Sequence, residues 1–275
     1  MFRRFKRWLR ERNPKPFPPE WNAIVERNVP LVAALPEEDR AELDKLVMTF
    51  LDEKHFEGAG GFEITDEVKV TIAAQACLLL IRRDTDVYPD LETILVYPSA
   101  YTAKSTRREG YVVIEERVDR LGESWDRGVV VLAWDSVQSG TTNTSDGHNV
   151  VLHEFAHQLD AEDGDMDGAP ALHTRARYAT WAAVLGAEYE DLVAKVHAGR
   201  GSDIDDYGAT SPPEFFAVVT EMFFEKPRQL RARHPELYAT FADFYQQDPA
   251  ALLTRAPTAD RADPPPSCRD GRPST

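Results

Sequence analysis

The sequence is poor in cysteine and has no long apolar run. Its two cysteines, Cys77 and Cys268, stand far apart and outside any metal-binding spacing. A disulfide framework is therefore not expected, and a reducing cytoplasm is the expected compartment. No stretch approaches the ~18 apolar residues that cross a bilayer. The basic start of the chain also lacks the apolar segment of a secretory signal.

Positive charge is outnumbered by negative charge. The 275 residues carry 32 Lys and Arg against 47 Asp and Glu, a net charge of -15. Phosphate would be repelled, which argues against direct nucleic-acid binding. Residues 1–13 are the exception, because they are basic and repeat aromatic and apolar residues at helical spacing. This segment could contact a membrane surface or a partner, or be a solvated terminus.

Proline divides the chain into three parts. Four prolines between positions 14 and 19 indicate a stiff linker behind the basic segment, so residues 1–19 form one unit. Residues 255–275 hold five prolines and almost nothing apolar, which predicts a disordered tail. Residues 20–254 are expected to form a single domain.

Within that domain the spacing of apolar residues changes twice, from helical to strand-like and back to helical. Helices are expected after Pro36 and from Asp66 to Arg82, because apolar residues recur there at helical spacing. Three short β-rich segments follow, at 93–97, 111–115 and 129–134. Helical patterns resume after Gly147. This segregation favours an α+β fold over a parallel βαβ sheet.

The stretch HEFAHQLD, residues 153–160, holds the candidate chemistry. His153 and His157 are four residues apart, so a helix presents both imidazoles on one face, as a tetrahedral zinc site requires. Glu154 is offset around the helix, where it can act as a base toward water. The pattern also arises by chance, as a polar stripe on a helix. Apolar neighbours such as Phe155 make an unpaired stripe costly and favour a metal.

A third ligand has to come from elsewhere. Asp163 lies where metzincins place their third ligand, but Asp160 replaces the glycine that their helix break requires. Glu214 is the better candidate, since it lies at the start of a helix embedded in apolar residues. Its alternative is a capping box with Ser211. Glu221, two turns further, is either a rival ligand or a carboxylate that orients a metal-bound histidine.

These motifs together resemble one family. HEFAHQLD, YGATSPPEFFAVVTEMFFE and FYQQDP are similar to the Mlc titration factor A family of zinc peptidases, over most of residues 29–253. The resemblance implies a zincin-like, gluzincin-type metallopeptidase domain with a small mixed sheet against the helix of the two histidines. It implies one zinc ion on His153, His157 and Glu214, with Glu154 as general base. It also matches Tyr207 to a tyrosine that points into such sites, the alternative being a loop tyrosine over apolar surface.

The expected reaction is metal-assisted hydrolysis of a peptide or protein, of aminopeptidase type. Substrate is expected to add as a strand beside the active helix, on residues 129–134. Acidic loops at 160–167 and 203–206 could favour basic or free-amino-terminal substrates, or be solvated charge. The alternative function, also from the resemblance, is a regulatory protein that sequesters a transcriptional repressor of sugar uptake.

Overall fold

A computed structural model describes residues 16–99, 101–109, 112–120, 122–125 and 128–255. The basic segment 1–13 and nearly all of the proposed tail lie outside these ranges. The proposed boundaries at residues 19 and 254 therefore remain predictions.

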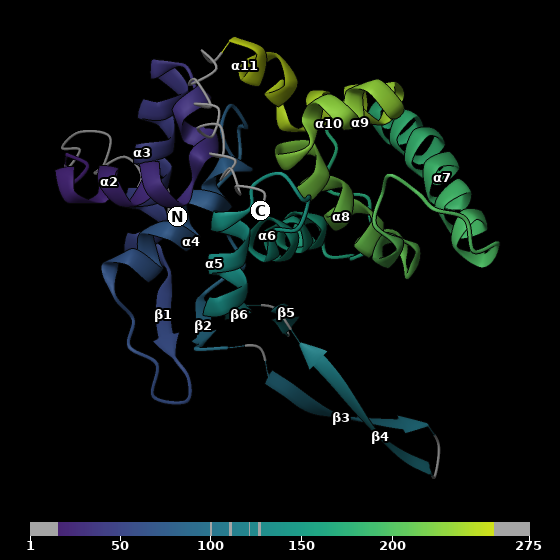
Figure 1. Ribbon diagram of the computed structural model, residues 1–275, viewed down its shortest axis with the longest axis horizontal. Coiled ribbons are helices and arrows are strands. Elements are labelled where there is room, and N and C mark those ends of the chain that lie inside the picture. The colour runs from purple at the N-terminus through teal and green to yellow at the C-terminus, as the bar shows by residue number, and fades with distance from the viewer. Residues whose placement is uncertain (1–15, 100, 110–111, 121, 126–127, 256–275) are drawn as a thin grey trace, which may run out of the picture.

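Helices make up most of the described chain (Figure 1). The helices α2 (Pro19–Asn28) and α3 (Glu37–Glu53) precede the first strand of the sheet, and α4 (Asp66–Leu78) lies between its first and second strands. Those that follow it are α5 (Trp134–Thr142), α6 (Val150–Asp160), α7 (Arg175–His197), α8 (Pro212–Glu225), α9 (Pro227–Arg233), α10 (Pro235–Tyr245) and α11 (Pro249–Arg255). Single 3-10 turns are η1 (Pro30–Ala34), η2 (Ala161–Asp163) and η3 (Asp206–Ala209). None of these helices is long and apolar enough to cross a membrane.

A four-stranded sheet with the order β1-β2-β6-β5 lies among the helices. Its strands are β1 (His55–Gly58), β2 (Thr93–Tyr97), β5 (Gly122–Trp125) and β6 (Val129–Ala133). The first three in this order are parallel, and β5 runs antiparallel to β6. A separate hairpin, β3 (Tyr101–Glu109) with β4 (Val112–Arg120), projects away from the body (Figure 1).

The structure confirms the α+β class and the small mixed sheet, with two corrections. A βαβ unit is present, since α4 connects the parallel strands β1 and β2. The sequence HFEG of β1 is too short and too polar to show a strand period. The second correction concerns the strand proposed to receive substrate. β6 is paired on both sides, so its backbone has no free edge, and β5 is the edge strand beside α6.

Local signals placed the helix ends to within a few residues. α3 begins at Glu37 behind Pro36, as predicted. α4 begins at Asp66, as predicted, and its cap is Thr65, whose side chain accepts from the backbone N–H of Val68. This helix ends at Leu78, four residues before the predicted Arg82, and Arg82 itself has a positive φ of 63°.

Helix α6 is packed on its inner face into the core. The fully buried ring of Phe155 lies 4.8 Å from that of Tyr88 and 5.6 Å from that of Phe50, between ring centroids. Helix α8 buries every residue from Phe215 to Glu225. Rings of this size each contribute several kcal/mol of burial, on the order of 3–5 by truncation to alanine. The two helices are thus rigid supports for the polar groups that they carry.

Candidate metal centre

The two histidines project from the outer side of α6. Asn149 caps the helix, since its side chain accepts hydrogen bonds from the backbone N–H groups of Val151 and Leu152, both at 3.1 Å. With the helix start fixed in this way, His153 and His157 lie one turn apart on the same face. Their ring centroids are 4.9 Å apart.

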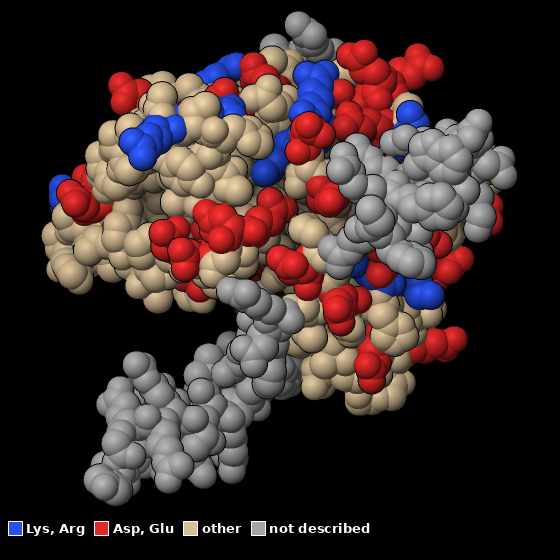
Figure 2. Space-filling model, turned by 180° about the vertical axis from the view of Figure 1, so that it is seen from behind, with Lys and Arg blue, Asp and Glu red and all other residues tan. Residues whose placement is uncertain are grey.

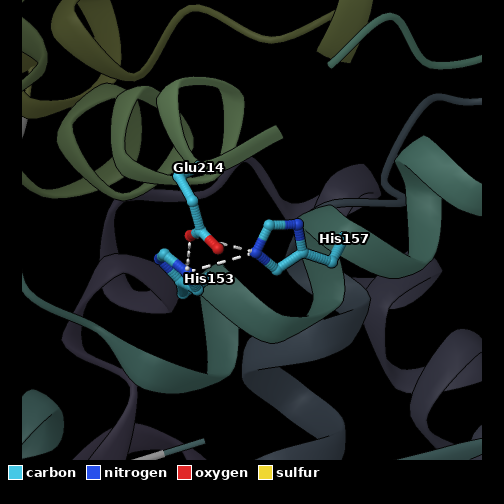
Figure 3. A group of neighbouring side chains, drawn as sticks. All are labelled: His153, His157 and Glu214. Atoms are coloured by element: carbon cyan, nitrogen blue, oxygen red, sulfur yellow. Dashed lines mark hydrogen bonds and ion pairs between the residues drawn. The ribbon is translucent and has the colours of Figure 1, made fainter. Parts of the chain in front are cut away.

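The third donor comes from the first turn of α8. Ser211 caps this helix through a 3.4 Å hydrogen bond from the backbone N–H of Glu214, and Pro212 occupies the first helical position. The Glu214 carboxylate turns toward the histidines (Figure 3). Of the capping box, only the hydrogen bond to the Ser211 side chain is formed, because the Glu214 carboxylate faces α6.

The three side chains bring their donor atoms close together. Glu214 Oε2 lies 3.0 Å from His153 Nε2 and 3.4 Å from His157 Nε2, and the two Nε2 atoms are 3.2 Å apart. Ligands at ~2.0–2.1 Å from a tetrahedral zinc ion are themselves ~3.3 Å apart. The donor set and its spacing thus fit a metal ion. Within the described ranges these three residues form the one group that could hold a metal.

The charges at this cluster favour a cation. Burial lowers the pKa of His153, but its hydrogen bonds to Glu214 and Glu221 outweigh burial and raise the pKa to about 10. Burial likewise raises the pKa of Glu214, yet hydrogen bonds from both histidines lower it to about 2. Surroundings that hold a proton on an imidazole so strongly also favour a divalent cation in its place.

Glu154 and Tyr207 lie beside the cluster. Glu154 is buried, and its Oε2 has no hydrogen-bond partner among the described residues. Burial raises its pKa to about 7, helped by the charges of Glu214 and Glu221 and opposed by His153. The Tyr207 ring centroid lies 5.9 Å from that of His153, and the side chain is 53% exposed. The role of Tyr207 in the site therefore stays a prediction beside its alternative, a loop tyrosine over apolar surface.

A second row of polar residues lies behind His153. Glu221 Oε1 is 2.8 Å from His153 Nδ1, on the side of the ring opposite Nε2. Glu221 thus lies outside the three-donor cluster. Its other oxygen accepts from the backbone N–H of Asn149, and Glu225 accepts from the Asn149 side-chain amide at 3.1 Å. Sequence reasoning missed Asn149 and Glu225, although two glutamates in the apolar run TEMFFE signal buried charge in need of partners.

The remaining candidates lie elsewhere. Asp163 is exposed and does not join the cluster. Among the other histidines, His148 forms a 3.7 Å ion pair with Asp205, and His234 pairs with Glu188 at 2.8 Å. His173 and His197 are likewise absent from the cluster.

A cavity of about 310 Å³ opens along the flank of α8. It is walled by the loop before α6, the loop before Tyr207 and the helix itself, through Asp146, Gly147, His148, Ser202, Asp203, Ile204, Asp205, Asp206, Val218, Met222 and Lys226. Four carboxylates face one lysine in this lining. The surface seen in Figure 2 also carries more acidic than basic side chains, in keeping with the net charge of -15.

An α+β fold that brings two histidines of an HExxH helix and a distal glutamate to one point defines a metallopeptidase of zincin type. The sequence comparisons agree. The sequence model of the glucose-regulated metallo-peptidase M90 family matches residues 4–246, so the chain belongs to this family.

Two kinds of relative were found. The uncharacterized protein slr2042 of Synechocystis sp. is 45% identical over 237 residues, which cover 86% of each chain. Mlc titration factor A of Escherichia coli (strain ATCC 8739) is 31% identical over 85% of this chain and 88% of its own. The same factor from Escherichia fergusonii is 29% identical over 92% and 95%.

Proposed function

We propose that the protein is a zinc-dependent peptidase of the cytoplasm, with aminopeptidase-like preference. The observation that carries this proposal is the 3.0–3.4 Å spacing of the donor atoms of His153, His157 and Glu214. Two imidazoles and one carboxylate are a typical donor set of catalytic zinc, which leaves a fourth position open. A zinc ion held by these three side chains would polarise the scissile carbonyl group and lower the pKa of a water molecule toward ~7.

Glu154 is the proposed general base. A carboxyl group whose pKa is about 7 can take a proton from water and return it to a leaving amine at neutral pH. Its burial in the same helix as both histidines fixes its distance from them. The proton transfers are thus assigned to one buried side chain on the helix that carries both histidines.

Tyr207 is the proposed hydrogen-bond donor to the oxyanion of the tetrahedral intermediate. Burial of the phenol, together with the negative charges of Glu214 and Glu154, raises its pKa to about 12. The phenol therefore keeps its proton throughout the neutral range. Its exposed position beside His153 leaves it accessible to substrate.

The proposed preference for a free amino terminus or a basic side chain draws on the acidic cavity along α8. Asp203, Asp205 and Asp206 line it and lead directly into Tyr207. Asp160, in contrast, is buried and accepts two hydrogen bonds from Gly168, so it is not available to substrate. Replacing Asp203, Asp205 and Asp206 by asparagine should reduce cleavage of free peptides relative to acetylated ones. An unchanged ratio would remove this part of the proposal.

Glu154→Gln tests the peptidase assignment. The variant should bind zinc at one ion per chain and unfold at the same denaturant concentration, but lose on the order of 10²–10⁴-fold in peptide hydrolysis. Glu162→Gln is a matched control, because burial also raises the pKa of Glu162 to about 7 two residues beyond the end of α6. Normal turnover by Glu154→Gln would end the assignment.

A second candidate is a regulatory binding protein that sequesters a transcriptional repressor. The name of its relatives, Mlc titration factor A, favours this function. The two roles are separable, because Glu154→Gln should retain binding of a repressor while hydrolysis is lost. Binding and hydrolysis that disappear together in this variant would contradict an independent binding role.

A further inference from the structure

Two buried glutamates of α8 hold the amino-terminal end of α6. Glu221 and Glu225 lie one helical turn apart, and each is 6% exposed. Glu221 bridges the backbone N–H of Asn149 and the Nδ1 of His153. Glu225 bridges the backbone N–H of Gly147 and the side-chain amide of Asn149, both at 3.1 Å. A continuous set of hydrogen bonds therefore connects Glu225, Asn149, Glu221 and His153.

The direction of each hydrogen bond in this set is fixed. The Asn149 Oδ1 already accepts from two backbone N–H groups of α6, so its amide cannot flip, and Nδ2 must donate to Glu225. Gly147 also donates through a backbone N–H. Both oxygens of Glu225 consequently act as acceptors. Glutamine cannot fill this role, because its side chain has one acceptor oxygen and an NH2 group that only donates.

The same logic reaches the metal ligand. Glu221 as a carboxylate only accepts, so His153 donates through Nδ1, and Nε2 is the ring nitrogen that faces His157 and Glu214. His157 lacks such support, since its buried Nδ1 has no hydrogen-bond partner among the described residues. The orientation of the donor cluster therefore depends on the support of His153.

We propose that Glu225 is a positioning residue for this metal centre, acting through Asn149 on the helix start and, with Glu221, on the ring of His153. The proposal rests on the metal site of the proposed function but not on its reaction. Capping α6 requires only the Asn149 oxygen, so the helix by itself would not need a buried carboxylate at position 225. What Glu225 adds is a fixed placement of Asn149, whose backbone N–H holds Glu221 against His153.

The test compares full-length Glu225→Gln with a matched control and a reciprocal exchange. Glu188→Gln is the control. Glu188 pairs with the Nδ1 of the buried His234 at 2.8 Å, the distance between Glu221 and the Nδ1 of His153, but it lies outside the metal cluster. The exchange is Asn149→Asp combined with Glu225→Gln. The carboxylate introduced at position 149 can still cap α6 and accept from the glutamine amide, while the glutamine oxygen accepts from Gly147.

Zinc affinity, measured by competition with a chromogenic chelator, and the absorption spectrum of the Co²⁺-loaded protein are the readouts. We expect zinc binding by Glu225→Gln to weaken on the order of ten-fold, as for supporting partners of metal ligands, with a changed Co²⁺ spectrum. Glu188→Gln should match the wild type, and the exchange variant should recover most of the affinity and the spectrum.

Three results would overturn the proposal. These are zinc affinity and a Co²⁺ spectrum of Glu225→Gln no different from those of Glu188→Gln, an exchange variant as weak as Glu225→Gln, or an exchange variant that does not fold. If Glu225→Gln alone fails to fold, the zinc affinity of the exchange variant decides: an affinity near that of the wild type supports the proposal, and a weakened one overturns it. Since no peptide enters these measurements, a wild-type chain that binds zinc but cleaves nothing would refute the peptidase proposal separately.

Discussion

Gly168 offers a sharp test of how the carboxyl end of α6 is connected to the start of α8. It has a φ of +83°, its N–H donates to both oxygens of Asp160 at 3.0 and 2.9 Å, and its carbonyl accepts from the Trp181 indole at 2.9 Å. A Cβ at this position would lie 2.5 Å from the carbonyl oxygen of Pro212. That contact is with backbone, at the first residue of the helix that carries Glu214.

The cost of Gly168→Ala is the sum of two effects. A left-handed backbone costs a residue with Cβ roughly 1–2 kcal/mol. Overpacking against a backbone that must shift adds about 1–3 kcal/mol. We expect the free energy of unfolding to fall by about 3.5 kcal/mol, the middle of the summed range. Because Pro212 stands two residues before Glu214, zinc affinity should fall as well.

Two other glycines separate these effects in urea unfolding. Gly199 has a φ of +63° with nothing within 4 Å of an added Cβ, so Gly199→Ala carries the backbone cost alone. Gly186 lies within α7 with no positive φ and open space around it, so Gly186→Ala should be neutral or stabilising by up to about 1 kcal/mol. Gly168→Ala no less stable than Gly199→Ala, or with unchanged zinc affinity, would refute the reasoning.

Two further predictions follow from the site. Tyr207→Phe should retain zinc but lose roughly 10²-fold in kcat, as expected when one oxyanion donor is removed; equal kcat in a steady-state peptide assay would exclude this role. Chelation of the metal should lower the free energy of unfolding measured with urea, by about 2.7 kcal/mol where free zinc had stood at 100 times its Kd, and added zinc should restore it.

Much of the site could be predicted because its chemistry is written in local patterns. The spacing of His153 and His157 determines their common face once the segment is a helix. Ser211 and Pro212 mark a helix start, which places Glu214 in the first turn. What these patterns do not contain is the distance between the two helices. The 3.0 Å approach of Glu214 to His153 is a tertiary contact across 61 residues. The residue pattern nominated Glu214 as a candidate, and the resemblance to a family implied its role as the third ligand.

The errors have a physical origin too. A strand of four residues such as HFEG carries too few alternations to be distinguished from loop, so the parallel crossover through α4 was invisible. Strand order is likewise a nonlocal property. Residues 129–133 precede the active helix in sequence, yet β5 pairs along their outer side and takes the edge of the sheet. Any substrate that adds as a strand on this side would therefore meet β5 and not β6.

Asp160 connects these observations. In the sequence it is the residue that departs from the metzincin glycine and directs the search for a ligand downstream. In the structure it is fully buried and holds Gly168, which packs directly on Pro212 at the start of α8. At the other end of α6, Asn149 is held by Glu221 and Glu225, at the end of α8. The two helices are thus antiparallel neighbours joined at both ends, and the donor atoms lie between these joints. A metal centre that needs its ligands placed to within tenths of an ångström gains from this arrangement, because neither helix can slide without breaking buried hydrogen bonds.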